Sequence, residues 1–195
     1  MDAVICDFLK TTFQNVRSSK RTAVLHEELL RELLEMTPKW VGLDWKFEYK
    51  LKEDGYGGTF DIDIAGFKDD KLTVAVLAKA INSNVAKNNK NFANTSIGEV
   101  HRLMDAPNLS PLEKVLFVSY YPRIAPVFTA GELSKFDNVP KSKEKTNIKP
   151  ILEKYWGDRV VSMDLYYDIG NIDNMVTKSD FDNIVPENID AIDFV

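Results

Sequence analysis

Two aspartates and one lysine in the middle of the chain have side chains and a spacing that could do chemistry together. Asp61 and Asp63 lie in segment 60–67 (FDIDIAGF), and because side chains alternate along a strand, both are expected on one face. Lys79 ends the apolar segment 72–80 (LTVAVLAKA), where it needs a charged partner or a water-filled cleft. Carboxylate oxygens are ligands for hard cations, and an ammonium group stabilises negative charge. A tight turn between the two segments would bring the carboxylates and Lys79 to one end of a sheet.

Three successive strands are expected to hold these residues. Segments 45–51 (WKFEYKL) and 60–67 alternate between apolar and polar side chains, as half-buried strands do. Segment 72–80 is almost wholly apolar and is therefore expected at the centre of the sheet. Glycine-rich and charged residues at 53–58 and 68–71 predict the two turns between these strands. The first half of the sheet is therefore expected to be antiparallel.

Helices and further strands are expected on both sides of this three-strand unit. Polar, lysine-rich residues at 134–149 indicate a surface loop. The order of elements predicts the fold class as α/β, with a mixed central sheet flanked by helices. Apolar spacing predicts helices at 2–16, 22–36, 97–104 and 151–155, and strands at 114–121 and 160–167.

One domain, residues 1–167, is expected to be followed by an acidic, partly ordered tail at 168–195. The chain has 195 residues and a net charge of −5, and the acidity is concentrated in this tail. We find no signal-peptide pattern and no apolar run long enough to cross a membrane. Cys6 is the single cysteine, which excludes a disulfide within one chain and favours a reducing, cytoplasmic location. His26 and His101 are far apart, so we expect structural or surface roles for both rather than a zinc motif.

The segment 57–80 (GGTFDIDIAGFKDDKLTVAVLAKA) resembles the motif region of the PD-(D/E)xK nuclease superfamily, which has the restriction-endonuclease-like fold. In that family a helix precedes a hairpin whose first strand carries an aspartate and whose second strand ends in acid-x-lysine. Asp63, or Asp61 as the neighbouring choice, and Lys79 match this motif, and residues 22–121 match the order of elements. The resemblance implies that the carboxylates bind Mg²⁺ or Mn²⁺ and that Lys79 serves the phosphate or the attacking water.

A leucine stands where this family has its second acid. The position is Leu77, which cannot bind a hard cation. Some members of the superfamily take the acid from the following helix, and Glu99 is placed to do so. Glu28 and Glu32, on the helix before the hairpin, are further candidates. The other interpretations are a site that no longer cuts, or a chance resemblance.

The segment that follows Lys79 has the composition of a surface that faces nucleic acid. Residues 71–98 contain no acid but several lysines and six asparagines. Lysine contacts phosphates, and asparagine can donate to and accept from base edges. A solvated polar surface without a partner is the alternative interpretation. The residues expected to contact nucleic acid are Asn82, Asn84, Lys87, Asn88 and Lys90.

The resemblance therefore implies a Mg²⁺-dependent DNA endonuclease, of the size of a type II restriction enzyme or a nuclease of a phage or mobile element. Asp63 and Glu99 are expected to bind the metal, and Asp61 and Lys79 complete the expected catalytic set. We expect a homodimer, because many such nucleases use two sites to cut two strands. The alternative is a protein that keeps the fold without cutting and binds nucleic acid or a protein partner.

Overall fold

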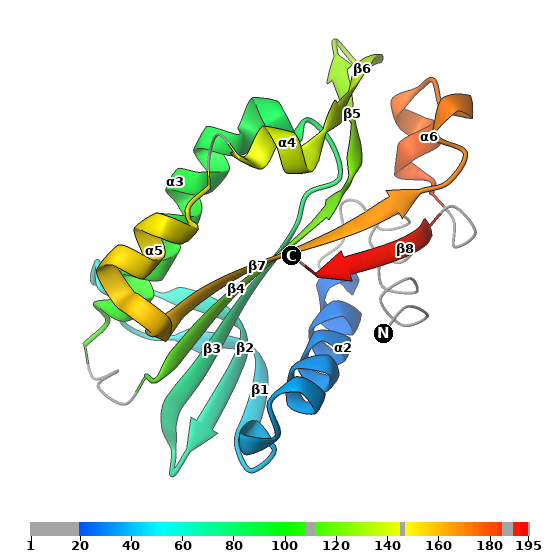
Figure 1. The fold of residues 1–195 in the computed structure, drawn as a ribbon. Helices are drawn as coiled ribbons and strands as arrows, with labels where there is room; N and C mark the ends of the chain where they lie inside the picture. The colour runs from blue at the N-terminus through cyan, green and yellow to red at the C-terminus, as the bar shows by residue number, and fades with distance from the viewer. Residues whose placement is uncertain (1–19, 108–111, 145–146, 185–188, 195) are drawn as a thin grey trace.

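A six-stranded mixed sheet forms the centre of the computed structural model, which describes residues 20–107, 112–144, 147–184 and 189–194 (Figure 1). The first three strands are antiparallel neighbours, the third to fifth are parallel, and the last is antiparallel to the fifth. In spatial order the strands are β1 (Asp44–Leu51), β2 (Phe60–Lys68), β3 (Lys71–Ala80), β4 (Lys114–Pro122), β7 (Val160–Ile169) and β8 (Ile189–Phe194).

The predicted arrangement of the central strands is confirmed. β2 and β3 are antiparallel neighbours, and β4 lies parallel to β3 on its other side. β3 and β4 are central because their apolar side chains are buried on both faces. The turn between β2 and β3 has positive φ angles at Asp69 (50°) and Asp70 (60°), a conformation that short polar residues tolerate and that matches the twist of a hairpin.

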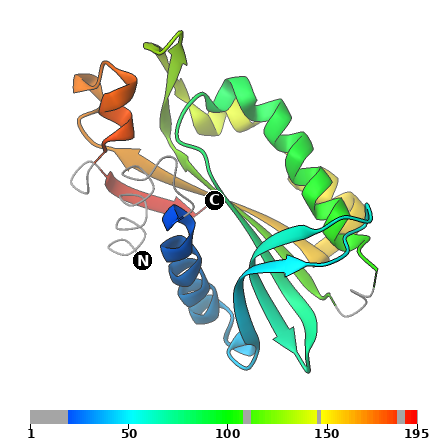
Figure 2. The same cartoon turned by 180° about the vertical axis from the view of Figure 1, so that it is seen from behind.

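Helices cover both faces of the sheet, as the sequence predicts for an α/β fold (Figures 1 and 2). α2 (Lys20–Met36) packs on one face, where its leucines Leu29 and Leu33 contact a core that includes Ile64 and Val118. The second core includes Val100 and Leu103 of the helix on the other face, together with Leu77 and Phe117 of the sheet. The helices of that face are α3 (Val85–Met104), α4 (Val139–Lys143) and α5 (Lys149–Trp156).

The expectation of a surface loop at 134–149 is wrong. β5 (Ile124–Thr129) and β6 (Glu132–Asn138) form a separate antiparallel pair, and α4 follows directly. β6 is largely exposed, so its polar sequence reflects its position at the surface and not a lack of regular structure. Its backbone is paired with β5, which needs no apolar side chains from β6.

The described part of 168–195 belongs to the domain instead of forming a separate tail. β8 pairs with β7 in the central sheet, and α6 (Lys178–Asp182) places Phe181 against Phe128 of β5, with ring centroids 5.5 Å apart. The apolar residues between the acids explain this, because they give the segment a buried side. The expected helix at 2–16 and Cys6 lie outside the described residues. The described residues also include the short 3₁₀ helices η1 (Pro38–Trp40), η3 (Gly157–Arg159) and η4 (Ile172–Asn174).

The turn between β1 and β2 is anchored to the end of α3. The carboxylate of Asp54 is buried and accepts hydrogen bonds from the backbone N–H groups of Tyr56 (2.8 Å) and Gly58 (3.0 Å). It also accepts a hydrogen bond from Nε of Arg102 (2.6 Å). These contacts fix the hairpin that carries the candidate site.

Within the described residues, no helix combines the length and apolar character needed to cross a membrane.

Candidate metal centre

His26 lies on the buried side of α2, directly beneath the sheet. It stands three, four and seven residues before Leu29, Leu30 and Leu33, so helical spacing places it on the same apolar stripe. Its side chain is 1% exposed. A polar imidazole in this position requires a polar partner, because an unpaired buried polar group is costly.

Glu48 supplies one such partner from β1 through an unusual backbone conformation. The strand register is continuous on both sides, with Phe47 opposite Ile64 and Tyr49 opposite Ile62. Glu48 itself has φ of 49°, in the left-handed region that costs a residue with a Cβ roughly 1–2 kcal/mol. Its Oε1 lies 2.8 Å from Nδ1 of His26. Strained backbone of this kind is often kept at functional sites because it aims a side chain.

Asp63 lies across from Glu48 and completes a group of three ligand side chains. One ligand atom from each of His26, Glu48 and Asp63 lies within 4.8 Å of the other two. Asp63 Oδ1 is 3.9 Å from Nε2 of His26, so the imidazole ring stands between two carboxylates. The group joins three elements that are separate in sequence, namely α2, β1 and β2.

The position of Asp63 depends on the opening between β2 and β3. The pairing of these strands ends at Ile64 and Val76, and beyond it Asp63 Oδ2 accepts a hydrogen bond from the backbone N–H of Ala78 (2.6 Å). Burial raises the pKa of the Asp63 carboxyl, against the lowering effects of this hydrogen bond and of the nearby charges of His26 and Lys79. A carboxylate held in this environment would be stabilised by a bound cation.

The chemistry of the three side chains fits a divalent metal ion. Among the described residues, neither ring nitrogen of His26 makes a hydrogen bond of acceptable geometry, although a carboxylate oxygen lies within 4 Å of each. A buried imidazole beside two carboxylates offers nitrogen and oxygen atoms that could bind one ion together. Imidazole suits Mn²⁺, Fe²⁺ or Zn²⁺, whereas Mg²⁺ prefers oxygen ligands alone.

Lys79 and Glu99, both predicted as site residues, form an ion pair, and the charge of Lys79 acts on Asp63. Lys79 Nζ donates a hydrogen bond to Glu99 Oε1 at 2.9 Å, from β3 to α3. The side chains are 37% and 18% exposed, so the ammonium group remains accessible to a ligand. Glu99 is not part of the metal-ligand group, and Leu77 is packed in the core. The structure thus groups Asp63 with His26 and Glu48, and not with Glu99.

The other predicted acids are not part of the group formed by His26, Glu48 and Asp63. Asp61 is exposed and forms an ion pair with Lys50 at 3.2 Å, so the two aspartates of β2 have different surroundings. Glu32 is buried, and its Oε1 lies 3.4 Å from Nη2 of Arg31. The side chain of Glu28 lies outside the described part of the structure.

Two of the residues expected to contact nucleic acid make hydrogen bonds within the fold. Asn82 Oδ1 accepts a hydrogen bond from the hydroxyl of Tyr167 (2.9 Å), and Asn84 Oδ1 accepts one from the backbone N–H of Phe128 (2.8 Å). Both asparagines therefore attach the start of α3 to neighbouring strands.

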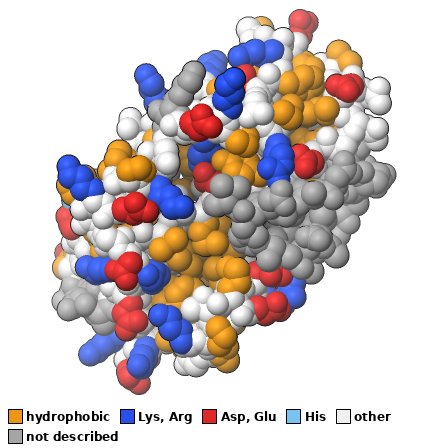
Figure 3. All heavy atoms as spheres, in the orientation of Figure 1, with side chains coloured by type: hydrophobic (Ala, Val, Ile, Leu, Met, Phe, Trp, Pro, Cys, Tyr) orange, Lys and Arg blue, Asp and Glu red, His pale blue; other side chains and the backbone are white. Residues whose placement is uncertain are grey.

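Lys87, Asn88 and Lys90 are exposed on the first turns of α3, where they are available to a partner. Figure 3 shows positive and negative side chains interspersed over the visible face. The electrostatic attraction for nucleic acid in this view would therefore come from individual lysines and not from a broad basic surface.

Two of the three candidate ligand side chains, His26 and Glu48, were not predicted as ligands from the sequence. His26 carried a usable signal, since a histidine inside a stripe of leucines must be buried against a polar partner. Glu48 carried none, because in WKFEYKL it has the pattern of an ordinary solvent-facing strand residue. Its left-handed backbone and its contact with α2 appear only in three dimensions.

Comparison with known proteins gives no family for this chain. No family model matches it, and no curated protein matches its sequence. A solved structure described as a protein of unknown function, AF1548, is similar with a TM-score of 0.35 and 11% sequence identity. The match covers 71% of this chain and spans about half, 55%, of that one.

Proposed function

We propose that this protein is a divalent-metal-dependent nuclease whose metal centre is formed by His26, Glu48 and Asp63. The observation that supports this most is the convergence of these three ligand side chains within 4.8 Å, beside an accessible lysine. The proposal retains the resemblance to the PD-(D/E)xK superfamily in a modified form. Asp63 and Lys79 match the motif, and Glu48 would provide the acid that Leu77 cannot.

Each side chain has a distinct role in this proposal. A metal ion held by His26, Glu48 and Asp63 would polarise the phosphate and lower the pKa of a bound water. Lys79 has three N–H donors, of which Glu99 takes one, so it can donate to a phosphate oxygen and stabilise the developing charge. Glu99 orients Lys79 through their hydrogen bond. The hydrogen bond from Ala78 to Asp63 fixes the carboxylate before substrate binds.

The ligand set favours Mn²⁺ over Mg²⁺ as the activating ion. A histidine among the three ligands raises affinity for transition metals, and carboxylates accept both ions. We retain DNA as the substrate, with Lys87 and Lys90 of α3 as phosphate contacts. A homodimer and a cytoplasmic location remain parts of the proposal and follow from the same resemblance.

Cleavage of defined substrates tests the proposal. Supercoiled plasmid and short labelled DNA and RNA would be incubated with Mn²⁺, Mg²⁺ or EDTA. We expect cleavage with Mn²⁺ that EDTA abolishes, loss of cleavage in Asp63→Asn, and unchanged cleavage in Asp61→Asn, which alters the exposed aspartate of the same strand. Equal activity of both variants would contradict the assigned site.

A second candidate function is binding of nucleic acid or a protein partner without cleavage. It is favoured by the ion pair between Lys79 and Glu99, which already occupies the lysine in the absence of substrate. Metal binding without cleavage of DNA or RNA would support this candidate.

A further inference from the structure

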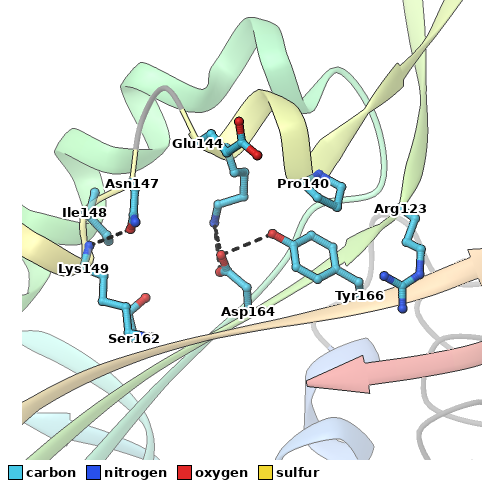
Figure 4. Close-up of a pocket in the computed structure, with 10 residues that line it drawn as sticks. Arg123, Pro140, Glu144, Asn147, Ile148, Lys149, Ser162, Asp164 and Tyr166 are labelled. Carbon is cyan, nitrogen blue, oxygen red and sulfur yellow. Dashed lines mark hydrogen bonds and ion pairs between the residues drawn. The ribbon is translucent and has the colours of Figure 1, made fainter. Parts of the chain in front are cut away.

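A polar hollow lies away from the metal centre, between β7, α4 and the start of α5. Its volume is about 330 Å³, at the lower end of the range for small-molecule sites. Ser162, Asp164 and Tyr166 of β7 form one side of it, since alternate residues of a strand point to the same face. Figure 4 shows Asp164 and Tyr166 rising from β7 toward the helices. Lys143 of α4 lines the hollow from the helical side.

The amine of Lys143 is enclosed by aromatic rings and by polar partners. Its side chain is 14% exposed. Nζ lies 4.1 Å from the centroid of the Tyr121 ring and 5.5 Å from that of Phe92. It also lies 2.8 Å from an oxygen of Asp164 and donates a hydrogen bond to the hydroxyl of Tyr121 at 2.8 Å. Because Lys143 also lines the hollow, its nitrogen stands between these partners and any molecule bound there.

These surroundings make Lys143 a better nucleophile than an exposed lysine. Burial lowers the pKa of its ammonium group, against the raising effects of the charge of Asp164 and of the hydrogen bond to it. A larger fraction of this amine than of an exposed one is therefore neutral at a given pH. Lysines desolvated in this way react with carbonyl compounds, because only the neutral amine carries the lone pair that attacks carbon.

The groups nearest the amine can move the protons that such a reaction requires. The carboxylate of Asp164 is at hydrogen-bond distance and can accept a proton from the ammonium group. The hydroxyl of Tyr166 lies 3.5 Å from Oδ2 of Asp164. Burial raises the pKa of both Tyr121 and Tyr166, so these hydroxyls stay protonated and act as hydrogen-bond donors.

The outer lining favours a ligand without net charge. Arg123 pairs with Asp168 at 3.4 Å, and Glu144 and Lys149 both line the hollow. Cations and carboxylates are therefore matched in number around it, and the hollow has no excess charge to attract an ion. Ser162 can donate to and accept from a hydroxyl group of a ligand. A small neutral molecule with a hydroxyl group fits this lining best.

We propose that Lys143 forms an imine with a small hydroxylated aldehyde or ketone that binds in this hollow. Asp164 takes a proton from the ammonium group, the neutral nitrogen attacks the carbonyl carbon, and the proton passes to the carbonyl oxygen. Asp164 then takes a second proton from nitrogen and delivers it to the hydroxyl group, which leaves as water while the C=N bond forms. One ammonium group and one carbonyl give one iminium group and one water, so the positive charge beside Asp164 is conserved.

This site is independent of the proposed metal centre. Lys79, Ser119 and Asp164 are register neighbours on adjacent strands, so Asp164 lies two strands away from Lys79. Neither a metal ion nor Lys79 takes part in imine formation. A test in EDTA therefore reports on Lys143 even if the nuclease proposal fails.

Reductive trapping in the full chain tests the proposal. The protein in EDTA at neutral pH is mixed with glycolaldehyde and sodium cyanoborohydride, which converts an imine into a stable secondary amine. Peptide mass spectrometry gives the rate of modification at Lys143 and at Lys141, an exposed lysine of the same helix that serves as internal control. Acetaldehyde, which lacks the hydroxyl group, is the matched probe.

We expect Lys143 to be modified at least about tenfold faster than Lys141, because a positioned proton acceptor assists only the enclosed amine. Burial without activation predicts the opposite order, since an enclosed amine is reached less often than an exposed one. Equal or slower modification of Lys143 would overturn the proposal. Lys143→Arg keeps a positive charge beside Asp164 and should remove the fast adduct, whereas Lys141→Arg should retain it.

The comparison of the two probes tests the assigned ligand class. The ratio of the rates at Lys143 and Lys141 should be at least about twofold higher with glycolaldehyde than with acetaldehyde, because of one added hydrogen bond. Ser162→Ala should remove this difference. Equal ratios for the two probes in the unchanged protein would show that the hollow does not select a hydroxylated carbonyl compound.

Discussion

Saturation with Mn²⁺ should raise the melting temperature of this protein, and Asp63→Asn should abolish that rise. A ligand that binds only the folded state stabilises it by roughly 2.7 kcal/mol at one hundred times its Kd. For chains of this size, roughly 2–4 °C of melting temperature corresponds to 1 kcal/mol, so the expected rise is roughly 5–11 °C. Asp61→Asn is the matched control, since Asp61 is exposed on the same strand and paired with Lys50.

The same variant should behave differently without metal. Burial raises the folded-state pKa of Asp63, so its contribution to stability is present below its ordinary pKa of 3.8 and is lost as pH rises through the folded-state value. At neutral pH the ionised carboxylate therefore destabilises the metal-free fold. In EDTA, Asp63→Asn should be at least as stable as the unchanged protein, and in Mn²⁺ it should be less stable.

Differential scanning fluorimetry with and without Mn²⁺, at a series of metal concentrations, measures both effects. A rise in melting temperature that Asp63→Asn retains would refute the assignment of Asp63 as a ligand. A rise that Asp61→Asn loses would refute the distinction between the two aspartates.

Four other substitutions test the site and the fold. Glu99→Gln should leave Mn²⁺ affinity within about twofold but lower the cleavage rate by about tenfold or more. The substitution disturbs the ion pair with the lysine of β3 and not the proposed metal ligands. A loss of Mn²⁺ affinity in calorimetry would show that Glu99 is itself a ligand. Gly66→Ala should destabilise the fold by about 1–3 kcal/mol in urea denaturation, because its Cβ would lie 2.8 Å from a tryptophan ring. Gly98→Ala on α3 meets nothing within 4 Å and should stabilise by about 0.5–1 kcal/mol, so equal effects would contradict the packing described. The backbone hydrogen bond from Gly58 lowers the pKa of Asp54, so the ionised carboxylate stabilises the fold and this stabilisation is lost as pH falls through the folded-state pKa. Asp54→Asn should therefore make the free energy of unfolding less dependent on pH in the acid range. An unchanged pH dependence would contradict this.

The central strands were predictable because the side-chain pattern of each strand and the residues of the turn between them indicate the same structure. The apolar run of β3, the alternation of β2 and the polar turn KDDK between them agree on one hairpin. β4 is likewise a continuous apolar segment. Buried strands are strongly specified by their side chains, so local patterns are sufficient to place them.

Three strands, β5, β6 and β8, escaped prediction, and for the last two the polar composition explains why. β6 is exposed and polar, so its pairing with β5 leaves no hydrophobic pattern in the sequence. β8 lies in an acidic segment, IDAIDF, where composition obscured the apolar residues between the acids. Net charge describes how a segment interacts with solvent and partners, but it does not exclude a strand.

The candidate site could be predicted only in part, because it is assembled by long-range contacts. Asp63 and Lys79 were accessible to sequence reasoning, as both interrupt buried strands with charge. Glu48 reaches the site through one left-handed residue, and Glu99 is directed to Lys79 by the packing of α3. Neither contact is encoded in local spacing, so the sequence points to Glu99 of α3, and not to Glu48 of β1, as the acid grouped with Asp63.

The location of bound Mn²⁺ tests most directly the claim that His26, Glu48 and Asp63 form a metal centre. Crystals grown with Mn²⁺ would be measured at a wavelength where manganese scatters anomalously. We predict one strong anomalous peak within ligand distance, roughly 2.0–2.3 Å, of an atom from each of the three side chains. A peak bound by Glu99 or Asp61 instead, or no peak between the three residues at saturating Mn²⁺, would contradict the account.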